Sequence, residues 1–154
     1  MLLTNHVLSG ALIGALARRP ATAFAAGVAS HFALDAVPHW GPWCGRGFLR
    51  VAVPDGLISL AAMGAITALA PAERRPAVLA GMTGAALPDI DKPAKLWFGR
   101  SPWPDAVDAF HLRIQPEAPR RAHIEIAAAG VFAVAALTAL RRPRAAAGSA
   151  GRLG

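Results

Sequence analysis

Five apolar segments, separated by stretches that contain charged, proline or histidine residues, are the main pattern along this chain. They cover residues 2–17, 21–37, 57–70, 77–87 and 124–140. None alternates apolar and polar residues as a half-buried strand does, and all are rich in Ala, Leu, Val and Gly. The pattern therefore predicts an all-α fold built from about five short helices.

The composition favours a membrane environment for these helices. Hydrophobic residues make up 55% of the 154 residues and charged residues only 16%, whereas about 25% is usual in soluble domains. A bilayer span takes about 20 apolar residues, so these spans must be short or extended by their polar ends. We expect an integral membrane bundle over residues 1–142 and a disordered tail over 143–154. The alternative is a soluble bundle, which the lack of charged outer faces disfavours.

Charge and cysteine content exclude other classes. The net charge is +7, but the arginines form short pairs at the ends of apolar segments instead of a basic face interleaved with aromatic residues, so we expect no nucleic-acid binding. A lone cysteine excludes an intramolecular disulfide. The first apolar segment lacks a preceding basic region, so we expect no cleaved signal peptide.

Small residues four positions apart predict close contacts between helices. This spacing lets helix backbones approach each other within a membrane, so we expect one compact bundle. The pairs are Gly10 with Gly14, Ala23 with Gly27, Gly64 with Ala68, and Gly81 with Ala85.

The polar residues are sorted by helix end. If successive helices alternate in direction, the His and Asp residues that interrupt the apolar segments all reach one end of the bundle, and arginine pairs reach the other. Residues four apart share a helix face, so His6 continues the line of Gly10, and His31 and Asp35 continue the line of Gly27. We therefore expect a site inside the bundle, at one membrane face.

Imidazole and carboxylate groups together are the ligands of zinc or of another divalent ion such as manganese. Buried carboxylates are costly without a compensating cation, so we predict one or two metal ions. Asp91 and Glu125 are candidates for a general base or a further ligand. The candidate metal ligands are His6, His31, Asp35, His39, Asp55, Asp89, His111 and His123.

Simpler interpretations exist for several of these residues. His31 and Asp35 can form a plain hydrogen-bonded pair between helices, and Asp89 and Asp91 can mark a solvated helix end. Asp55 lies in a Val-Pro-Asp-Gly stretch that is typical of a turn. His111 lies in a predicted long loop, 92–121, whose basic residues favour a surface of anionic lipid. Trp40, Trp43, Trp97 and Trp103 are typical of a membrane interfacial belt.

Three motifs carry a resemblance to a known family. These are Asn5-His6, the segment Ser30-His31-Phe32-Ala33-Leu34-Asp35 with Pro38-His39-Trp40, and Leu87-Pro88-Asp89-Ile90-Asp91. Together they resemble the bacterial membrane-bound metal-dependent hydrolases, and the resemblance covers most of the chain up to about Glu125.

The second motif is also similar to the HFxGDxxxPxH signature of zinc-dependent phospholipases C and the related fungal single-strand nucleases. This resemblance implies that His31 and Asp35 are metal ligands in an all-helical fold and that phosphate esters are hydrolysed. His39 follows Pro38 directly, which departs from the signature. Lys92 stands where the membrane family commonly has a histidine after the aspartates.

The sequence thus predicts a metal-dependent hydrolase acting on an ester, in particular a phosphate ester of a lipid or lipid-linked substrate. The rival is a non-catalytic membrane protein, either a metal or proton carrier or a regulatory or structural partner. A carrier needs ligands near the middle of the membrane, whereas these candidates gather at one end. We expect a multi-pass protein of the bacterial inner membrane, with the arginine pairs cytoplasmic and the site extracytoplasmic. The oligomeric state stays open.

Overall fold

The computed structural model describes residues 1–41, 45–116, 118 and 120–142 of the chain, and the fold of these residues is all-helical, as predicted. The described residues contain no β-strand. The predicted tail, 143–154, lies outside them, as does Trp43. The helices are α1 (Leu3–Leu16), α2 (Pro20–Asp35), α3 (Gly45–Leu69), α4 (Arg75–Ala86), the short 3-10 helix η1 (Leu87–Ile90), α5 (Asp91–Phe98), α6 (Asp105–Ile114) and α7 (Ala122–Arg141).

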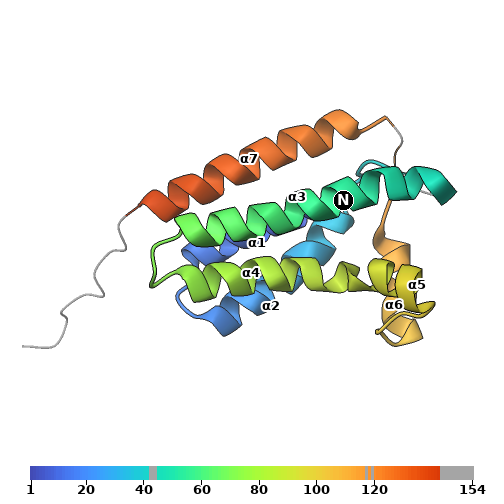
Figure 1. Ribbon diagram of the computed structural model, residues 1–154, viewed down its shortest axis with the longest axis horizontal. Coiled ribbons are helices and arrows are strands. Elements are labelled where there is room, and N and C mark those ends of the chain that lie inside the picture. Colours follow the sequence, from blue (N-terminus) through green and yellow to red (C-terminus); the bar gives the residue numbers. More distant parts are fainter. Residues whose placement is uncertain (42–44, 117, 119, 143–154) are drawn as a thin grey trace, which may run out of the picture.

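Helix α1 is the centre of the bundle. It packs against α2, α3, α4 and α7, and its residues Asn5 through Ala11 are all buried. Figure 1 shows α3 and α7 along one side of the molecule and α2 and α4 along the other. The short helices α5 and α6 lie together at the end where α1 begins (Figure 1).

The tightest packing joins α1, α2 and α4 through glycines. A Cβ atom added at Gly10 or at Gly27 would overlap the carbonyl oxygen of Gly81, and one added at Gly81 would overlap the carbonyl oxygen of Gly10. The backbones of three helices therefore meet at Gly81, as close packing of small residues permits. The predicted close approach is confirmed at these positions.

The same prediction is wrong for Gly64. This glycine is exposed on α3, and a Cβ atom added to it would meet no atom within 4 Å. The four-residue spacing of Gly64 and Ala68 was therefore not a packing signal, because neither residue faces a neighbouring helix.

Two predictions about connections are also wrong. The predicted loop at 92–121 contains α5 and α6; in α6, acidic Asp105 and Asp108 lie in the first turn and basic Arg113 in the last, which favours a helix. The predicted turn at Asp55 is helical, because α3 begins at Gly45 and continues through Pro54. Asp55 and Ser59 face the start of α1 from successive turns of α3, and these tertiary contacts override the local turn pattern.

One of the arginine pairs, Arg74 with Arg75, closes the opposite end of the bundle. Arg74 is buried, and its guanidinium donates hydrogen bonds to the carbonyl oxygens of Ala139 (2.8 Å) and Arg142 (2.7 Å) at the end of α7. Arg75 donates to the carbonyl oxygen of Ala70 (3.1 Å), after the end of α3. The last carbonyl groups of a helix have no partner within it, and these arginines supply partners together with a charge that complements the helix dipole.

Two helices are long and apolar enough to cross a membrane. They are the segment Phe48–Leu69 of α3 and Ala122–Arg141, which is α7. In the most apolar windows of these helices only 11% and 22% of the residues are buried within the bundle. Helices α1, α2 and α4 are shorter, at 14, 16 and 12 residues.

Substitution at Gly81 tests the packing. We expect Gly81→Ala to lower the free energy of unfolding by about 2 kcal/mol, because three helix backbones must separate to admit the methyl group. Gly64→Ala is the matched control and should leave stability unchanged or raise it by up to about 1 kcal/mol, because the position is open and Ala favours a helix. Thermal unfolding followed by circular dichroism measures both; equal melting temperatures would contradict the packing described here.

Candidate metal centre

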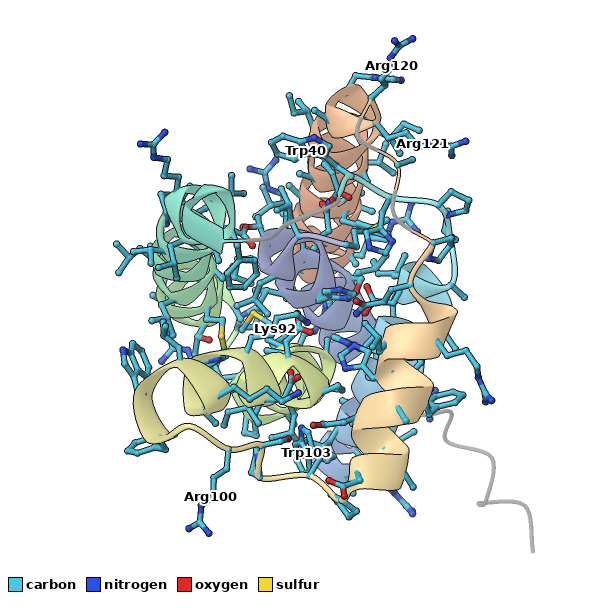
Figure 2. The ribbon with its side chains drawn as sticks, turned by 90° about the vertical axis from the view of Figure 1, so that its right-hand side faces the viewer. Trp40, Lys92, Arg100, Trp103, Arg120 and Arg121 are labelled. Carbon is cyan, nitrogen blue, oxygen red and sulfur yellow. The ribbon has the colours of Figure 1, made fainter. Side chains whose placement is uncertain are left out.

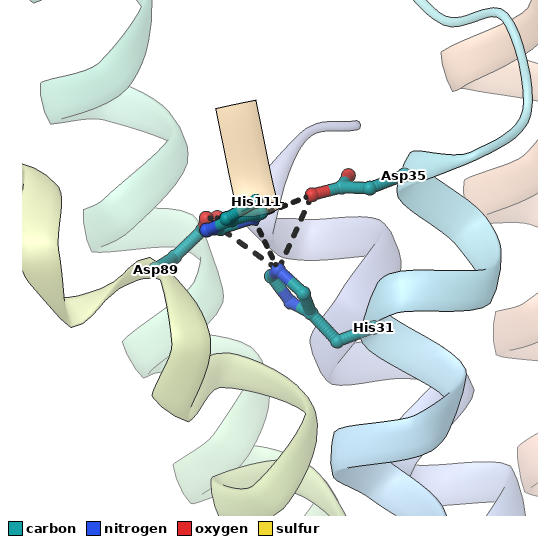
Figure 3. A group of neighbouring side chains, drawn as sticks. All are labelled: His31, Asp35, Asp89 and His111. Atoms are coloured by element: carbon teal, nitrogen blue, oxygen red, sulfur yellow. Dashed lines mark hydrogen bonds and ion pairs between the residues drawn. The ribbon is translucent and has the colours of Figure 1, made fainter. Parts of the chain in front are cut away.

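Four buried side chains from three elements converge at the end of the bundle where α1 begins. They are His31 and Asp35 of α2, Asp89 of η1 and His111 of α6. One ligand atom from each lies within 4.8 Å of every other. His31 Nε2 lies 3.0 Å from His111 Nε2, 3.2 Å from Asp35 Oδ2 and 3.6 Å from Asp89 Oδ1 (Figure 3). We call these four residues the His-Asp cluster.

The proton on His31 can be assigned from its other ring nitrogen. His31 Nδ1 lies 2.8 Å from the carbonyl oxygen of Ala85, which can only accept a hydrogen bond, so Nδ1 carries a proton. In neutral His31 the lone pair on Nε2 therefore points into the cluster. Backbone carbonyls hold metal-binding histidines in this way in many proteins.

The atoms that face this lone pair are themselves acceptors or potential acceptors. Asp35 Oδ2 and Asp89 Oδ1 are carboxylate oxygens, and His111 Nε2 is a ring nitrogen. Such a convergence needs a proton or a cation between the groups. Two imidazole nitrogens and two carboxylate oxygens form a ligand set that suits zinc and other divalent first-row ions. The cluster could therefore hold a metal ion, and its donor chemistry fits one.

Asp35 is the most densely bonded residue of the cluster. Its Oδ1 atom lies 3.1 Å from His6 Nε2 and 2.6 Å from the amino group of Met1. Its Oδ2 atom lies 2.9 Å from His111 Nε2 and 2.7 Å from the side-chain amide of Gln115. His6 stacks on His31 with ring centroids 4.0 Å apart, so His6 lies behind the cluster, against the far oxygen of Asp35.

Lys92 lies beside the cluster as a neighbouring positive charge. Its ammonium group forms an ion pair with Asp89 Oδ1. Burial opposes ionisation of Asp89, but the pKa of Asp89 lies below its usual value, and the Lys92 ammonium is the largest influence that lowers it. Figure 2 shows Lys92 in the middle of this end of the molecule, whereas Arg100, Arg120 and Arg121 point outward.

Asp55 and Glu125, two predicted site residues, bind the start of α1 instead. Asp55 accepts hydrogen bonds from the backbone N–H groups of Leu3 (2.7 Å) and Thr4 (3.2 Å). Glu125 accepts them from the backbone N–H of Leu2 (3.1 Å) and the side-chain amide of Asn5 (2.5 Å). The first N–H groups of a helix lack internal partners and favour negative charge, so these carboxylates anchor α1.

Three further predicted residues also lie outside the His-Asp cluster. His39 is buried, and its Nδ1 atom donates to the carbonyl oxygen of Val37 (2.9 Å). Asp91 pairs with Lys95 (2.9 Å), which also pairs with Asp108 (2.8 Å). His123 is exposed at the start of α7. Within the described part of the chain, these residues do not form a second group of three or more potential ligands.

Gln115 is a site residue that the sequence reasoning missed. Its side-chain amide lies 2.8 Å from His111 Nε2 as well as 2.7 Å from Asp35 Oδ2. It follows His111 by four residues, directly after the last residue of α6, and this spacing brings both side chains to the same side of the helix end. A prediction of helix α6 from the sequence would have indicated Gln115 through this spacing.

Comparison of the chain with protein-family models, with curated proteins and with solved structures finds no match. The chemistry of the site therefore rests on the geometry of its own residues.

Metal binding tests the His-Asp cluster directly. We expect the purified protein to bind one divalent ion per chain, and we expect His31→Ala and Asp35→Asn each to weaken that binding by about tenfold or more. His123→Ala is the matched control, because it removes an exposed histidine and should leave affinity unchanged. Elemental analysis after equilibrium dialysis against zinc or manganese gives both quantities. Equal metal content in all four proteins would contradict a site at the cluster.

A second experiment separates the anchoring of α1 from metal binding. We expect Glu125→Ala to lower the free energy of unfolding by about 2 kcal/mol, because buried donors on Leu2 and Asn5 lose a charged acceptor. Metal stoichiometry should stay at one ion per chain. Glu73→Ala, at an exposed glutamate, is the control for loss of a carboxylate. Loss of metal with an unchanged melting temperature would instead identify Glu125 as a ligand.

Proposed function

We propose that this protein is a membrane-bound metal-dependent hydrolase that acts on an ester, in particular a phosphate ester of a lipid or lipid-linked substrate. The observation that carries the proposal is the buried convergence of His31, Asp35, Asp89 and His111 around the lone pair of His31 Nε2. The motifs that contain the first three of these residues resemble those of membrane-bound metal-dependent hydrolases and, for His31 and Asp35, zinc-dependent phospholipases C.

The four residues of the His-Asp cluster would hold the ion, with zinc favoured by the nitrogen and oxygen donors and manganese as the second choice. When bound, such an ion acts as a Lewis acid toward a phosphoryl oxygen and makes a water molecule more acidic. Gln115 orients the carboxylate of Asp35, and His6 supports its other oxygen. Lys92, paired with Asp89, provides a positive charge for an anionic ester group.

The proposed location is the bacterial inner membrane, with several crossings. The support for it is the exposure of large apolar residues on the two helices long enough to span, including Leu57 and Leu60 of α3 and Ile126 and Val131 of α7. Apolar patches of this kind are unusual on the water-facing surface of a monomer. We propose that the end with the arginine pairs faces the cytoplasm, so that the His-Asp cluster lies at the extracytoplasmic face.

Hydrolysis by the metal-loaded protein tests the function. We expect zinc- or manganese-loaded protein to release p-nitrophenol from long-chain alkyl p-nitrophenyl phosphate, and Asp35→Asn to lower kcat/KM by about a hundredfold or more. His123→Ala should retain the activity of the unmodified protein. A chelator should abolish turnover, and added metal should restore it.

The alternative is a non-catalytic metal or proton carrier or a regulatory or structural partner. It would be supported if the protein binds metal at the His-Asp cluster but cleaves no phosphate monoester, phosphate diester or carboxylic ester. Metal uptake into sealed vesicles, lost in Asp35→Asn, would then identify a carrier.

A further inference from the structure

A groove of about 620 Å³ lies beside the His-Asp cluster, and its walls are mainly apolar. One wall is α3 between Phe48 and Leu60, and another is α5, with Leu96 and Trp97. The start of α1 contributes Leu2 and Leu3. The volume is in the range of cavities that hold small organic ligands.

Part of the polar lining of the groove adjoins the candidate metal centre. Asp89, a member of the His-Asp cluster, and Gln115, which contacts Asp35 and His111, both line it. Among the lining residues that the structure describes, Lys92 is the one lysine or arginine, and Met1, whose amino group pairs with Asp35, also lines the groove. The polar groups of Asp55, by contrast, are occupied by the start of α1. The groove thus joins an apolar channel to a positive charge beside the cluster.

We infer that this groove binds the hydrocarbon chain of a lipid whose phosphate head group lies at Lys92, next to the His-Asp cluster. The inference rests on the proposed function, for which it names the site of the hydrocarbon chain and the residues that select the substrate. Three observations favour this occupant: the apolar walls, the Lys92 ammonium group beside Asp89, and the position of α3. Leu57 and Leu60 line the groove and belong to a segment apolar enough to lie in a bilayer, so the groove adjoins the lipid in the proposed orientation.

Two glycines on α3 provide a matched pair of positions for testing the apolar part of the groove. Gly56 lines the groove and Gly64 does not, yet a Cβ atom added at either position meets no atom within 4 Å. Both glycines lie in the same apolar helix, eight residues apart. A phenylalanine at position 56 should fill the groove, whereas a phenylalanine at position 64 should not affect it.

Two lysines on α5 provide a second matched pair, which tests binding of the phosphate head group. Lys92 lines the groove and pairs with Asp89. Lys95 is exposed, pairs with Asp91 and Asp108, and is not among the lining residues. Lys92→Met and Lys95→Met remove the same charge from the same helix, but only the first should weaken binding of a phosphate.

The experiment measures quenching of tryptophan fluorescence by a doxyl-labelled alkyl phosphate, with the protein in phosphatidylcholine nanodiscs. Trp97 and Trp40 line the groove and report the bound chain. We expect saturable quenching that unlabelled dodecyl phosphate reverses and that dodecanol and inorganic phosphate do not. Gly56→Phe and Lys92→Met should each weaken binding about tenfold or more, and Gly64→Phe and Lys95→Met should match the unmodified protein.

Several results would overturn the inference. Equal binding by Gly56→Phe and Gly64→Phe would exclude the groove as the chain site, and full displacement by inorganic phosphate would reduce the site to one for free phosphate. Equal binding of an alkyl trimethylammonium probe would exclude a role for Lys92. Metal content, measured in the same samples, should be retained in Gly56→Phe. If no variant or parent protein binds metal but the quenching pattern holds, the hydrolase proposal fails and the lipid groove stands.

Discussion

The contact of three helix backbones at Gly81 sets the geometry on which the site depends. Gly10 of α1 and Gly27 of α2 both reach the carbonyl oxygen of this residue. The site residues continue the same helix faces, since His6 precedes Gly10 by four positions and His31 follows Gly27 by four. The glycines thus bring α1 and α2 close enough to α4 for His6 to stack on His31 and for His31 to reach the carbonyl oxygen of Ala85.

Two kinds of buried carboxylate follow from this arrangement. Asp55 and Glu125 face the unpaired N–H groups at the start of α1, so their charge is stabilised by the backbone and by Asn5. Asp35 and Asp89 face imidazoles, an amide and an ammonium group. The first pair can be satisfied by protein groups alone, whereas the second pair leaves a histidine lone pair directed at oxygen atoms. That difference separates structural acids from candidate ligands.

The sequence was sufficient for features that depend on helical periodicity. The all-α class and the convergence of His31, Asp35 and Asp89 at one end follow from where polar residues interrupt apolar segments. The sequence was insufficient where long-range contacts determine the local structure. The Val-Pro-Asp-Gly stretch is a good local turn, but Asp55 has partners on α1 that hold it in a helix. Burial could not be predicted at these positions either. Nothing in the local sequence distinguishes the exposed residues Gly64 and His123 from the buried residues Gly81 and His111.

The anchoring of α1 also has a consequence for the order of folding. Asn5 is synthesised early, yet its partner Glu125 follows 120 residues later in the chain, and Asp55 joins Leu3 across 52 residues. Long-range contacts of this kind are slow to form because the intervening chain must first be arranged. The central helix is therefore synthesised before its partners but completed after them: the N–H groups at its start lack their full set of carboxylate acceptors until α7 has been synthesised.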